Sequence, residues 1–139
     1  MKALILGVGG QDGAYLAKFL LNKGYEVIGS SRDCQLSQFS KLKELNIFNE
    51  VKKISISIND YSSVFNAIKL YEPDEIYNLA GQSSVGLSFE QPLESIESTI
   101  KGTLTILETI KTIDKPIKFY NAGSSDCYGN TNSFPANEN

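Results

Sequence analysis

The sequence predicts an α/β fold, a doubly wound parallel sheet with helical crossovers, built by one domain of 139 residues. Apolar segments of strand length alternate with segments of helical periodicity. One apolar strand, at residues 3–6, runs directly into glycines and a helix, and another, at residues 76–80, runs into a loop of small and amide side chains. Because the carboxyl ends of neighbouring parallel strands meet at one edge of a sheet, we expect these two loops to lie side by side.

Five strands are expected, separated by helices and turns. The first is apolar throughout, as in strands that helices cover on both faces, whereas the third alternates Ile54, Ile56 and Ile58. The expected strands are residues 3–6, 25–29, 54–58, 76–80 and 117–122.

Helical patterns fill the segments between these strands. The first helix carries Leu16, Phe19 and Leu20 and stops at Gly24, and Asp60 can cap a later one. The polar segment 30–49 is expected to hold one short amphipathic helix. A long helix begins near Pro92. Its apolar stripe is expected to face the core and consists of Ile96, Ile100, Leu104 and Leu107.

Composition excludes several classes of function. A net charge of -3 and the lack of a basic run argue against binding to nucleic acid or to an anionic membrane. Cys34 and Cys127 are too few for a metal cage, and no N-terminal segment resembles a signal peptide, so we expect a cytoplasmic protein without a metal site. Because the chain has no histidine, any acid or base must be a carboxyl, hydroxyl, phenol or amine.

The first strand ends in a glycine-rich turn that predicts a dinucleotide site. Gly7, Gly10 and Gly13 have a G-x-x-G-x-x-G spacing between the strand and the helix. A side chain there would keep a pyrophosphate from the backbone, and the helix N-terminus supplies amide donors and partial positive charge. The context of strand, turn and helix makes this interpretation stronger than the spacing alone.

The end of the second strand favours NADP over NAD. An acidic residue there would bond the ribose 2'-hydroxyl, whereas an arginine pairs with a 2'-phosphate. The chain has Ser30, Ser31 and Arg32 at this place. Two alternatives stay open: Arg32 is a solvated surface charge, or the adjacent Asp33 neutralises it or faces the ribose itself.

Four segments of the sequence carry a resemblance to one enzyme family, and they are residues 7–16, 23–29, 73–92 and 102–110. The resemblance runs nearly from end to end, and the loop after residue 76 carries its narrowest signals. The segments resemble the GDP-mannose 4,6-dehydratases, which are extended short-chain dehydrogenases/reductases with a Rossmann-type domain.

The resemblance implies a set of residues that contact the cofactor. Ile58 matches an apolar residue that packs on the adenine ring. The other matching positions are Gly7, Val8, Gly9, Gly10, Gln11, Asp12, Arg32, Leu79, Ala80, Gly81, Gln82 and Ser83. Departures from the family pattern include Ser57, where relatives have an aspartate that reads adenine, and Glu94, which stands in place of a tyrosine that faces the cofactor.

The same resemblance implies two catalytic residues near the end of the chain. Ser124 matches a threonine that holds the sugar 4-hydroxyl, and Asp126 matches a glutamate that acts in the loss of water across C5 and C6. A hydroxyl can orient a substrate oxygen, and a carboxylate beside it can take a proton. The alternative for Asp126 is an ordinary turn aspartate.

The family's Tyr-x-x-x-Lys segment would follow beyond these residues. We therefore expect residues 1–139 to be an incomplete NAD(P)-binding domain of a longer dehydratase, without the final strands and the substrate domain, and inactive alone. The resemblance implies that the complete enzyme is a homo-oligomer that converts GDP-mannose, or a related nucleotide sugar, to GDP-4-keto-6-deoxy-mannose with NADP. The alternatives are another nucleotide-sugar epimerase or reductase, and a non-catalytic module that binds NADP.

Overall fold

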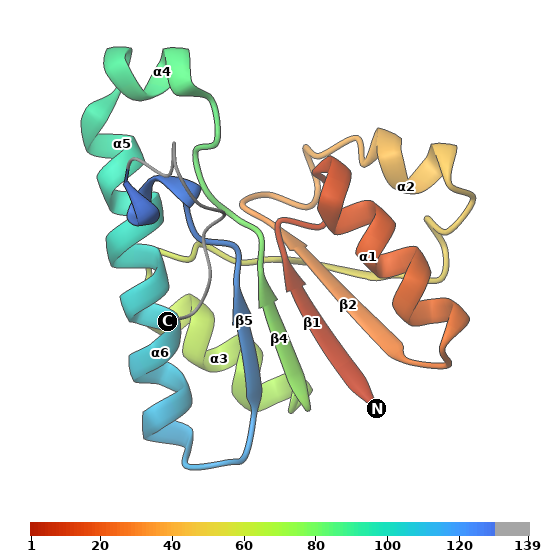
Figure 1. Ribbon diagram of the computed structural model, residues 1–139. Coiled ribbons are helices and arrows are strands. Elements are labelled where there is room, and N and C mark those ends of the chain that lie inside the picture. The colour runs from red at the N-terminus through yellow and green to blue at the C-terminus, as the bar shows by residue number, and fades with distance from the viewer. Residues whose placement is uncertain (130–139) are drawn as a thin grey trace.

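A single parallel sheet organises the chain. The computed structural model describes residues 1–129, with the backbone alone for Ser125 and Asp126. The strand order is β3-β2-β1-β4-β5, so β1 pairs with both β2 and β4 (Figure 1). This order confirms the doubly wound sheet that the sequence predicts. The strands are β1 (Lys2–Leu6), β2 (Glu26–Ser31), β3 (Lys52–Ser55), β4 (Glu75–Asn78) and β5 (Lys118–Asn121).

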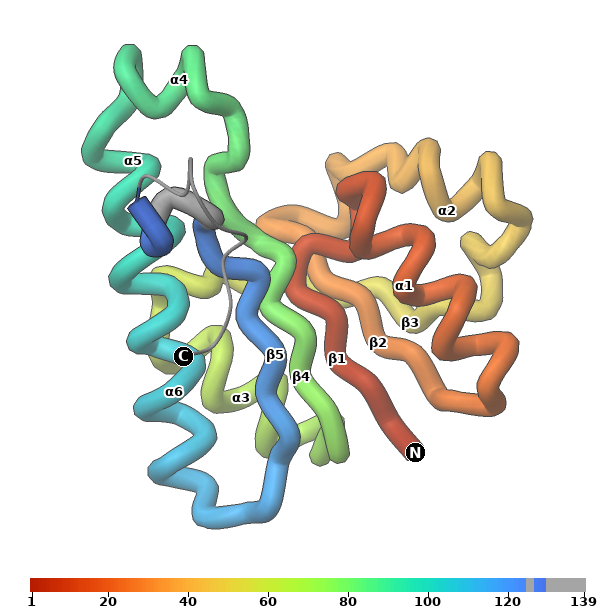
Figure 2. Tube along the Cα trace, viewed as in Figure 1, coloured from red at the N-terminus to blue at the C-terminus, as the bar shows by residue number. Residues whose placement is uncertain are grey.

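Helices cover both faces of the sheet. In Figure 2, α1 and α2 lie on one side of the strands, whereas α3 and α6 lie on the other. Their bounds are α1 (Gln11–Asn22), α2 (Ser40–Glu44), α3 (Tyr61–Tyr71) and α6 (Gly102–Ile113). Between β4 and α6 the chain forms α4 (Val85–Glu90), α5 (Pro92–Ile96) and a π-helical turn, η1 (Glu97–Lys101). A 3₁₀ turn, η2 (Ser125–Tyr128), follows β5. No helix in the described part of the chain is long and apolar enough to span a bilayer.

The side chains of β1 alternate between two hydrophobic cores. Ala3 and Ile5 pack with the buried residues of α1 and α2, and Leu4 and Leu6 pack with those of α3 and α6. All four are at most 1% exposed. A strand buried on both faces must be apolar at every position, which explains the continuous apolar run.

The third strand is shorter than expected. β3 ends at Ser55, although the predicted strand continued to Ile58. The Ile56 amide still donates to the Ser31 carbonyl at 2.9 Å, but β2 ends there and offers no further partner. The chain then turns into α3, which Asp60 caps by accepting from the Ser63 amide at 2.6 Å. The cap was predicted correctly.

The predicted inner stripe of the long helix is wrong. Its four residues, Ile96, Ile100, Leu104 and Leu107, are 45–64% exposed. The buried residues of this segment are Ser98, Gly102, Ile106 and Thr109, and the partly buried Ile110 and Ile113 pack against the same core. A Cβ on Gly102 would lie 2.7 Å from Cδ1 of Ile58, so a larger residue there would require the Ile58 side chain to move. The helix therefore packs through a different face from the predicted stripe, with isoleucines near its C-terminus and a glycine where it meets Ile58.

Candidate cofactor and substrate site

The glycine turn after β1 lies against two neighbouring segments. Gly7 has a φ of +86°, and a Cβ there would lie 2.9 Å from the Leu79 carbonyl oxygen. The amides of Gly7 and Val8 both donate to the Ser30 carbonyl at 3.1 Å, which ties the turn to the end of β2. A left-handed conformation and a backbone contact both require glycine at position 7.

The turn continues into the N-terminus of α1. Gly10 is the N-cap and has no side chain to accept from the first-turn amides. Its own amide donates to the Gly7 carbonyl at 3.1 Å. A Cβ on Gly13 would lie 2.5 Å from the same carbonyl oxygen, so the helix starts directly against the turn. The first amides of α1 therefore face outward from the end of β1 and are available to an anionic group.

The loop after β4 forms the opposite wall and is held by the π turn. The Gln82 amide donates to Oγ of Ser98, which is 6% exposed, and that hydroxyl donates to the Ser95 carbonyl. Ser84 caps α4 by accepting from the Leu87 amide at 3.4 Å. A π turn inserts one residue into a helix and is often found at functional sites. Here the π turn places the Ser98 hydroxyl so that it holds the loop after β4, which the sequence predicts to bind a ligand.

Two asparagines at matching strand ends form the floor. Asn78 and Asn121 are register partners on β4 and β5, and Nδ2 of Asn78 donates to Oδ1 of Asn121 at 2.8 Å. Thr103 on α6 also donates to that oxygen, at 3.4 Å. Sequence reasoning did not name these residues as part of the site. An amide at the carboxyl end of two expected strands was the signal that could have found them.

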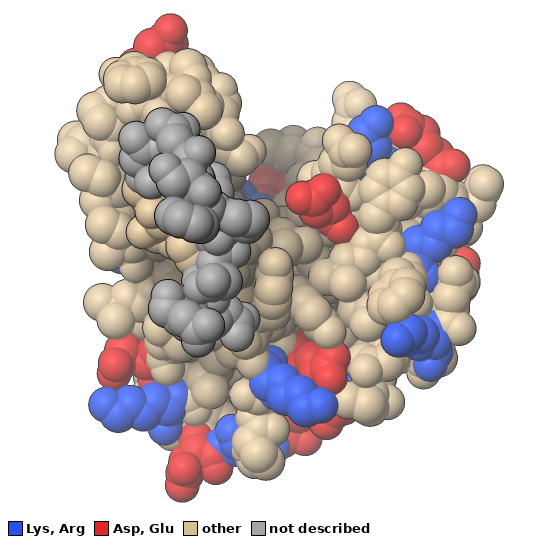
Figure 3. Space-filling view, in the orientation of Figure 1, with Lys and Arg blue, Asp and Glu red and all other residues tan. Residues whose placement is uncertain are grey.

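These walls enclose one cavity of about 740 Å³. It lies above the carboxyl ends of β1, β4 and β5, in the hollow visible in Figure 3 between α4 and α1. Among the described residues that line it, Asp12 carries the only charge. Eleven predicted site residues belong to the lining: Gly7, Gly10, Gln11, Asp12, Gly13, Leu79, Ala80, Gly81, Gln82, Ser83 and Ser124.

The other predicted residues lie outside this lining. The Val8 side chain is fully buried, where it fills the space next to Gly29. A Cβ added at Gly9 would lie 3.7 Å from the Phe39 ring. Ile58 packs on the core and against Gly102. The Asp126 side chain lies outside the described residues. The roles of Val8, Gly9, Ile58 and Asp126 toward a cofactor or a sugar stay predictions.

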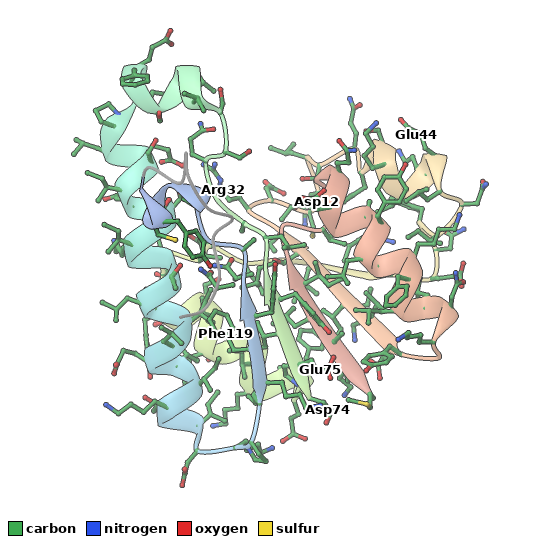
Figure 4. All side chains as sticks on the ribbon, viewed as in Figure 1. Asp12, Arg32, Glu44, Asp74, Glu75 and Phe119 are labelled. Atoms are coloured by element: carbon green, nitrogen blue, oxygen red, sulfur yellow. The ribbon has the colours of Figure 1, made fainter. Side chains whose placement is uncertain are left out.

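Arg32 forms an ion pair across the site. Its Nη1 lies 3.2 Å from Oε1 of Glu94 on α5. Figure 4 shows Arg32 in the gap between the α4–α5 side of the molecule and the α1 side, where Asp12 is labelled. Asp33 does not form this pair, because its Oδ1 accepts from the amides of Gln35 and Leu36 at 2.8 and 3.2 Å. Arg32 therefore has an acidic partner, but from a distant element and not from its sequence neighbour.

The cradle fits a dinucleotide cofactor. Added Cβ atoms at Gly7 and Gly13 would collide with backbone, which shows that the turn, the loop after β4 and α1 pack as closely as backbone allows. At Gly10 an added Cβ would meet only the Gly7 oxygen, at 3.4 Å, so the space in front of Gly10 belongs to the cavity. A pyrophosphate needs this combination of bare backbone and a helix N-terminus.

Comparisons with known proteins identify relatives over the whole chain. Residues 4–139 match the family described as GDP-mannose 4,6 dehydratase. A GDP-mannose 4,6-dehydratase of Vibrio cholerae is 40% identical over 99% of this chain, and GDP-mannose 4,6 dehydratase 2 of Arabidopsis thaliana is 40% identical over 93% of it. The chain spans only 39% and 37% of those two proteins, less than half of their length.

A solved structure shares the fold. The UDP-glucose 4-epimerase of Bifidobacterium longum, in complex with NAD+ and UDP, superposes with a TM-score of 0.83. The match covers 99% of this chain and 41% of the epimerase, at 24% sequence identity. At that identity the likeness concerns the fold alone.

Proposed function

The chain belongs to the GDP-mannose 4,6-dehydratase family, and we propose on this basis that the complete protein converts GDP-mannose to GDP-4-keto-6-deoxy-mannose and water with NADP. In this proposal residues 1–139 form the cofactor-binding part, the remainder of the protein supplies the sugar-nucleotide pocket, and the complete enzyme is a cytoplasmic homo-oligomer. The observation that carries the proposal is the bare-backbone cradle of Gly7, Gly10 and Gly13 facing the loop after β4.

Each wall of the cavity has a distinct task in this proposal. The first-turn amides of α1 hold the pyrophosphate, and Arg32 holds the 2'-phosphate. When bound, NADP supplies a reversible hydride acceptor for the sugar. The loop of residues 79–83, held by Ser98, would contact the nicotinamide half of the cofactor.

The catalytic groups of the proposal follow β5. The Ser124 hydroxyl lines the cavity and orients the sugar 4-hydroxyl by a hydrogen bond. The Asp126 carboxylate takes the proton from C5 and gives it to the departing C6 hydroxyl, so that water leaves. The overall oxidation state of the sugar is kept because the hydride removed from C4 returns to C6, with a proton added at C5. The residues that assist the removal of the 4-hydroxyl proton belong to the proposed remainder of the protein.

Cofactor binding by the chain itself is the first test. We expect NADP to bind measurably in isothermal calorimetry, and Gly10→Val to abolish binding because the side chain fills the space for the pyrophosphate. Gly86→Val is the matched control, since Gly86 lies on α4, outside the cavity lining, with nothing within 4 Å of an added Cβ. Equal NADP affinity for the Gly10→Val protein and its parent would remove the assignment.

The chemistry is tested in the complete protein. Asp126→Asn should leave the oxidation at C4 intact but slow the loss of water by about 100-fold or more, a typical contribution of general acid-base catalysis. Reduced cofactor should then accumulate after GDP-mannose is added, visible as nicotinamide absorbance. Ser124→Ala should slow the first step instead and give little of that signal. An unchanged rate of product formation by Asp126→Asn would make Asp126 an ordinary turn residue.

The product separates this proposal from the other enzyme classes of the fold. An epimerase or a reductase on the same scaffold would return a sugar that keeps its oxygen at C6. A 4-keto-6-deoxy product in mass spectrometry supports the dehydratase, and a product of unchanged mass would favour an epimerase.

A further inference from the structure

The Arg32–Glu94 ion pair joins the two sides of the cofactor site. Arg32 follows β2 directly after Ser31, and Ser30 accepts from the glycine turn, so Arg32 lies close to the turn that begins the cradle. Glu94 lies on α5, next to Ser95, which lines the cavity. The Arg32 side chain is 81% exposed and that of Glu94 is 33% exposed. A ligand at the mouth can therefore reach the guanidinium, but it meets the carboxylate as well.

The other polar groups near Arg32 are engaged in their own loop. Asp33 accepts from two backbone amides, and the Ser31 hydroxyl accepts from the Ser37 hydroxyl at 2.9 Å. The cavity lining adds no cation among the described residues, and Asp12 adds a negative charge. A dinucleotide with an additional phosphate would thus meet a single arginine that already has a carboxylate partner.

We infer that Glu94 is a specificity-determining residue, which lowers the affinity for NADP relative to NAD by competing with the 2'-phosphate for Arg32. The inference rests on the proposed function in so far as Arg32 is the group that binds the 2'-phosphate. NADP must displace the carboxylate from Arg32 or bind beside it, and both cost free energy. The 2'-hydroxyl of NAD carries no charge and pays neither cost.

The size of the effect follows from the exposure of the pair. A solvent-exposed ion pair contributes little, and its loss changes an equilibrium by about fivefold at most, while repulsion between Glu94 and the phosphate adds to this. Both contributions are screened by salt. Glu94→Gln should therefore tighten NADP binding by about fivefold or more at low ionic strength. NAD binding should change by less than about twofold, because the substitution keeps the shape of the side chain.

The test compares the affinities of NADP and NAD by calorimetry in five proteins. They are the parent, Glu94→Gln, Glu97→Gln, Arg32→Ala and the double variant that combines Arg32→Ala with Glu94→Gln. Glu97 is the matched control, because it is an exposed glutamate one turn further along the same helical segment, loses the same charge and forms no ion pair with Arg32, whose partner is Glu94. We expect the ratio of the two affinities to shift toward NADP in Glu94→Gln only. Arg32→Ala should weaken NADP selectively, and Glu94→Gln made in that background should lose most of its effect.

The outcomes separate this inference from the proposed function. If the parent and Glu94→Gln proteins bind NADP and NAD with the same ratio, or if Glu97→Gln shifts the ratio as much, the role of Glu94 is overturned while the proposed function stands. An effect of Glu94→Gln that persists in full without Arg32 overturns the competition. If neither protein binds NADP, the proposed use of NADP fails and the inference fails with it. Matching circular dichroism spectra of all five proteins establish that affinity, and not folding, has changed.

Discussion

The glycines of the first turn differ in what a Cβ added at each position would meet. At Gly13 an added Cβ would collide with backbone, 2.5 Å from the Gly7 oxygen and 2.8 Å from Cα of Val8, whereas at Gly10 it would project into the cavity. One glycine is therefore required by the fold and the other by the ligand. The sequence motif does not distinguish them, because it records only spacing.

Gly13→Ala should accordingly destabilise the protein. Backbone cannot move as easily as a side-chain end, so we expect a loss of about 2 kcal/mol or more in the free energy of unfolding. Urea denaturation of Gly13→Ala and of Gly86→Ala measures it. The control should be neutral or slightly more stable, since alanine favours a helix over glycine by up to about 1 kcal/mol. Similar midpoints for Gly13→Ala and its parent would show that the turn can relax.

The strands β4 and β5 share a polar contact around the buried Glu75. The Tyr77 hydroxyl donates to Oε2 of Glu75 at 2.7 Å, and Nζ of Lys118 lies 3.5 Å from Oε1 of the same carboxylate. Glu75 is 7% exposed. Burial of the phenol, together with its hydrogen bond to the negatively charged Glu75, raises the pKa of Tyr77 to about 12.

Tyr77→Phe should therefore reduce stability in a manner that depends on pH. A raised pKa in the folded state means that the contribution is complete below the ordinary tyrosine pKa near 10 and is lost as pH rises toward about 12. At pH 7 we expect a loss of about 1 kcal/mol, because Glu75 keeps only its lysine partner. The difference from the parent should shrink above pH 10 in denaturation experiments. A constant difference up to pH 12 would contradict the raised pKa.

Elements were predictable from sequence where local chemistry alone determines them. The continuous run of β1, the glycine turn and the Asp60 cap each follow from neighbouring residues, and the structure has them as expected. The helix between β4 and β5 is different. Periodicity located an apolar stripe, but the helix packs through another face, where Ile106 is buried and Gly102 lies against Ile58, a residue distant in sequence.

The residues of the site were likewise predictable where they follow from local sequence, but not where distant segments meet. Residues next to the glycine turn and in the loop after β4 were found, since their chemistry is local. The pair of Arg32 with Glu94, the Asn78–Asn121 contact and the hold of Ser98 on the loop all join segments that only the fold brings together. Sequence spacing can mark some of these residues singly, as with the two asparagines at strand ends, but it does not show which of them are partners.

The surface of the whole molecule combines a low charge with an exposed apolar stripe. Phe89 on α4 and Leu93 on α5 are also exposed, at 84% and 76%, and the net charge at pH 7 is only -3. At the isoelectric point near pH 5.0 charge repulsion between molecules vanishes. Attraction between apolar surfaces then acts without opposition.

We expect light scattering by the chain to be greatest near pH 5.0 and to fall by pH 7. Ile100→Gln should reduce the light scattering near pH 5.0 by about twofold or more, because the substitution interrupts the stripe without changing the net charge. Leu70→Gln is the control, since Leu70 is a leucine of α3 with 72% exposure that lies outside the stripe. Equal effects of the two substitutions would show that surface hydrophobicity in general, and not the stripe, drives association.

The central position of β1 also determines when the cavity can form during synthesis. The strand β1 can pair with β2 once residue 31 has been made. Its other neighbour is β4, whose Glu75 pairs with Ala3, and β5 joins later, when Lys118 pairs with Glu75. The loop after β4, which forms the opposite wall of the cavity, can therefore pack against the glycine turn only after more than half of these 139 residues have been synthesised. Such distant pairings make folding slow and leave strand edges exposed in the meantime. The nascent chain thus passes through a stage in which β1, α1 and β2 are complete while one edge of β1 is open to a chaperone or to another nascent chain.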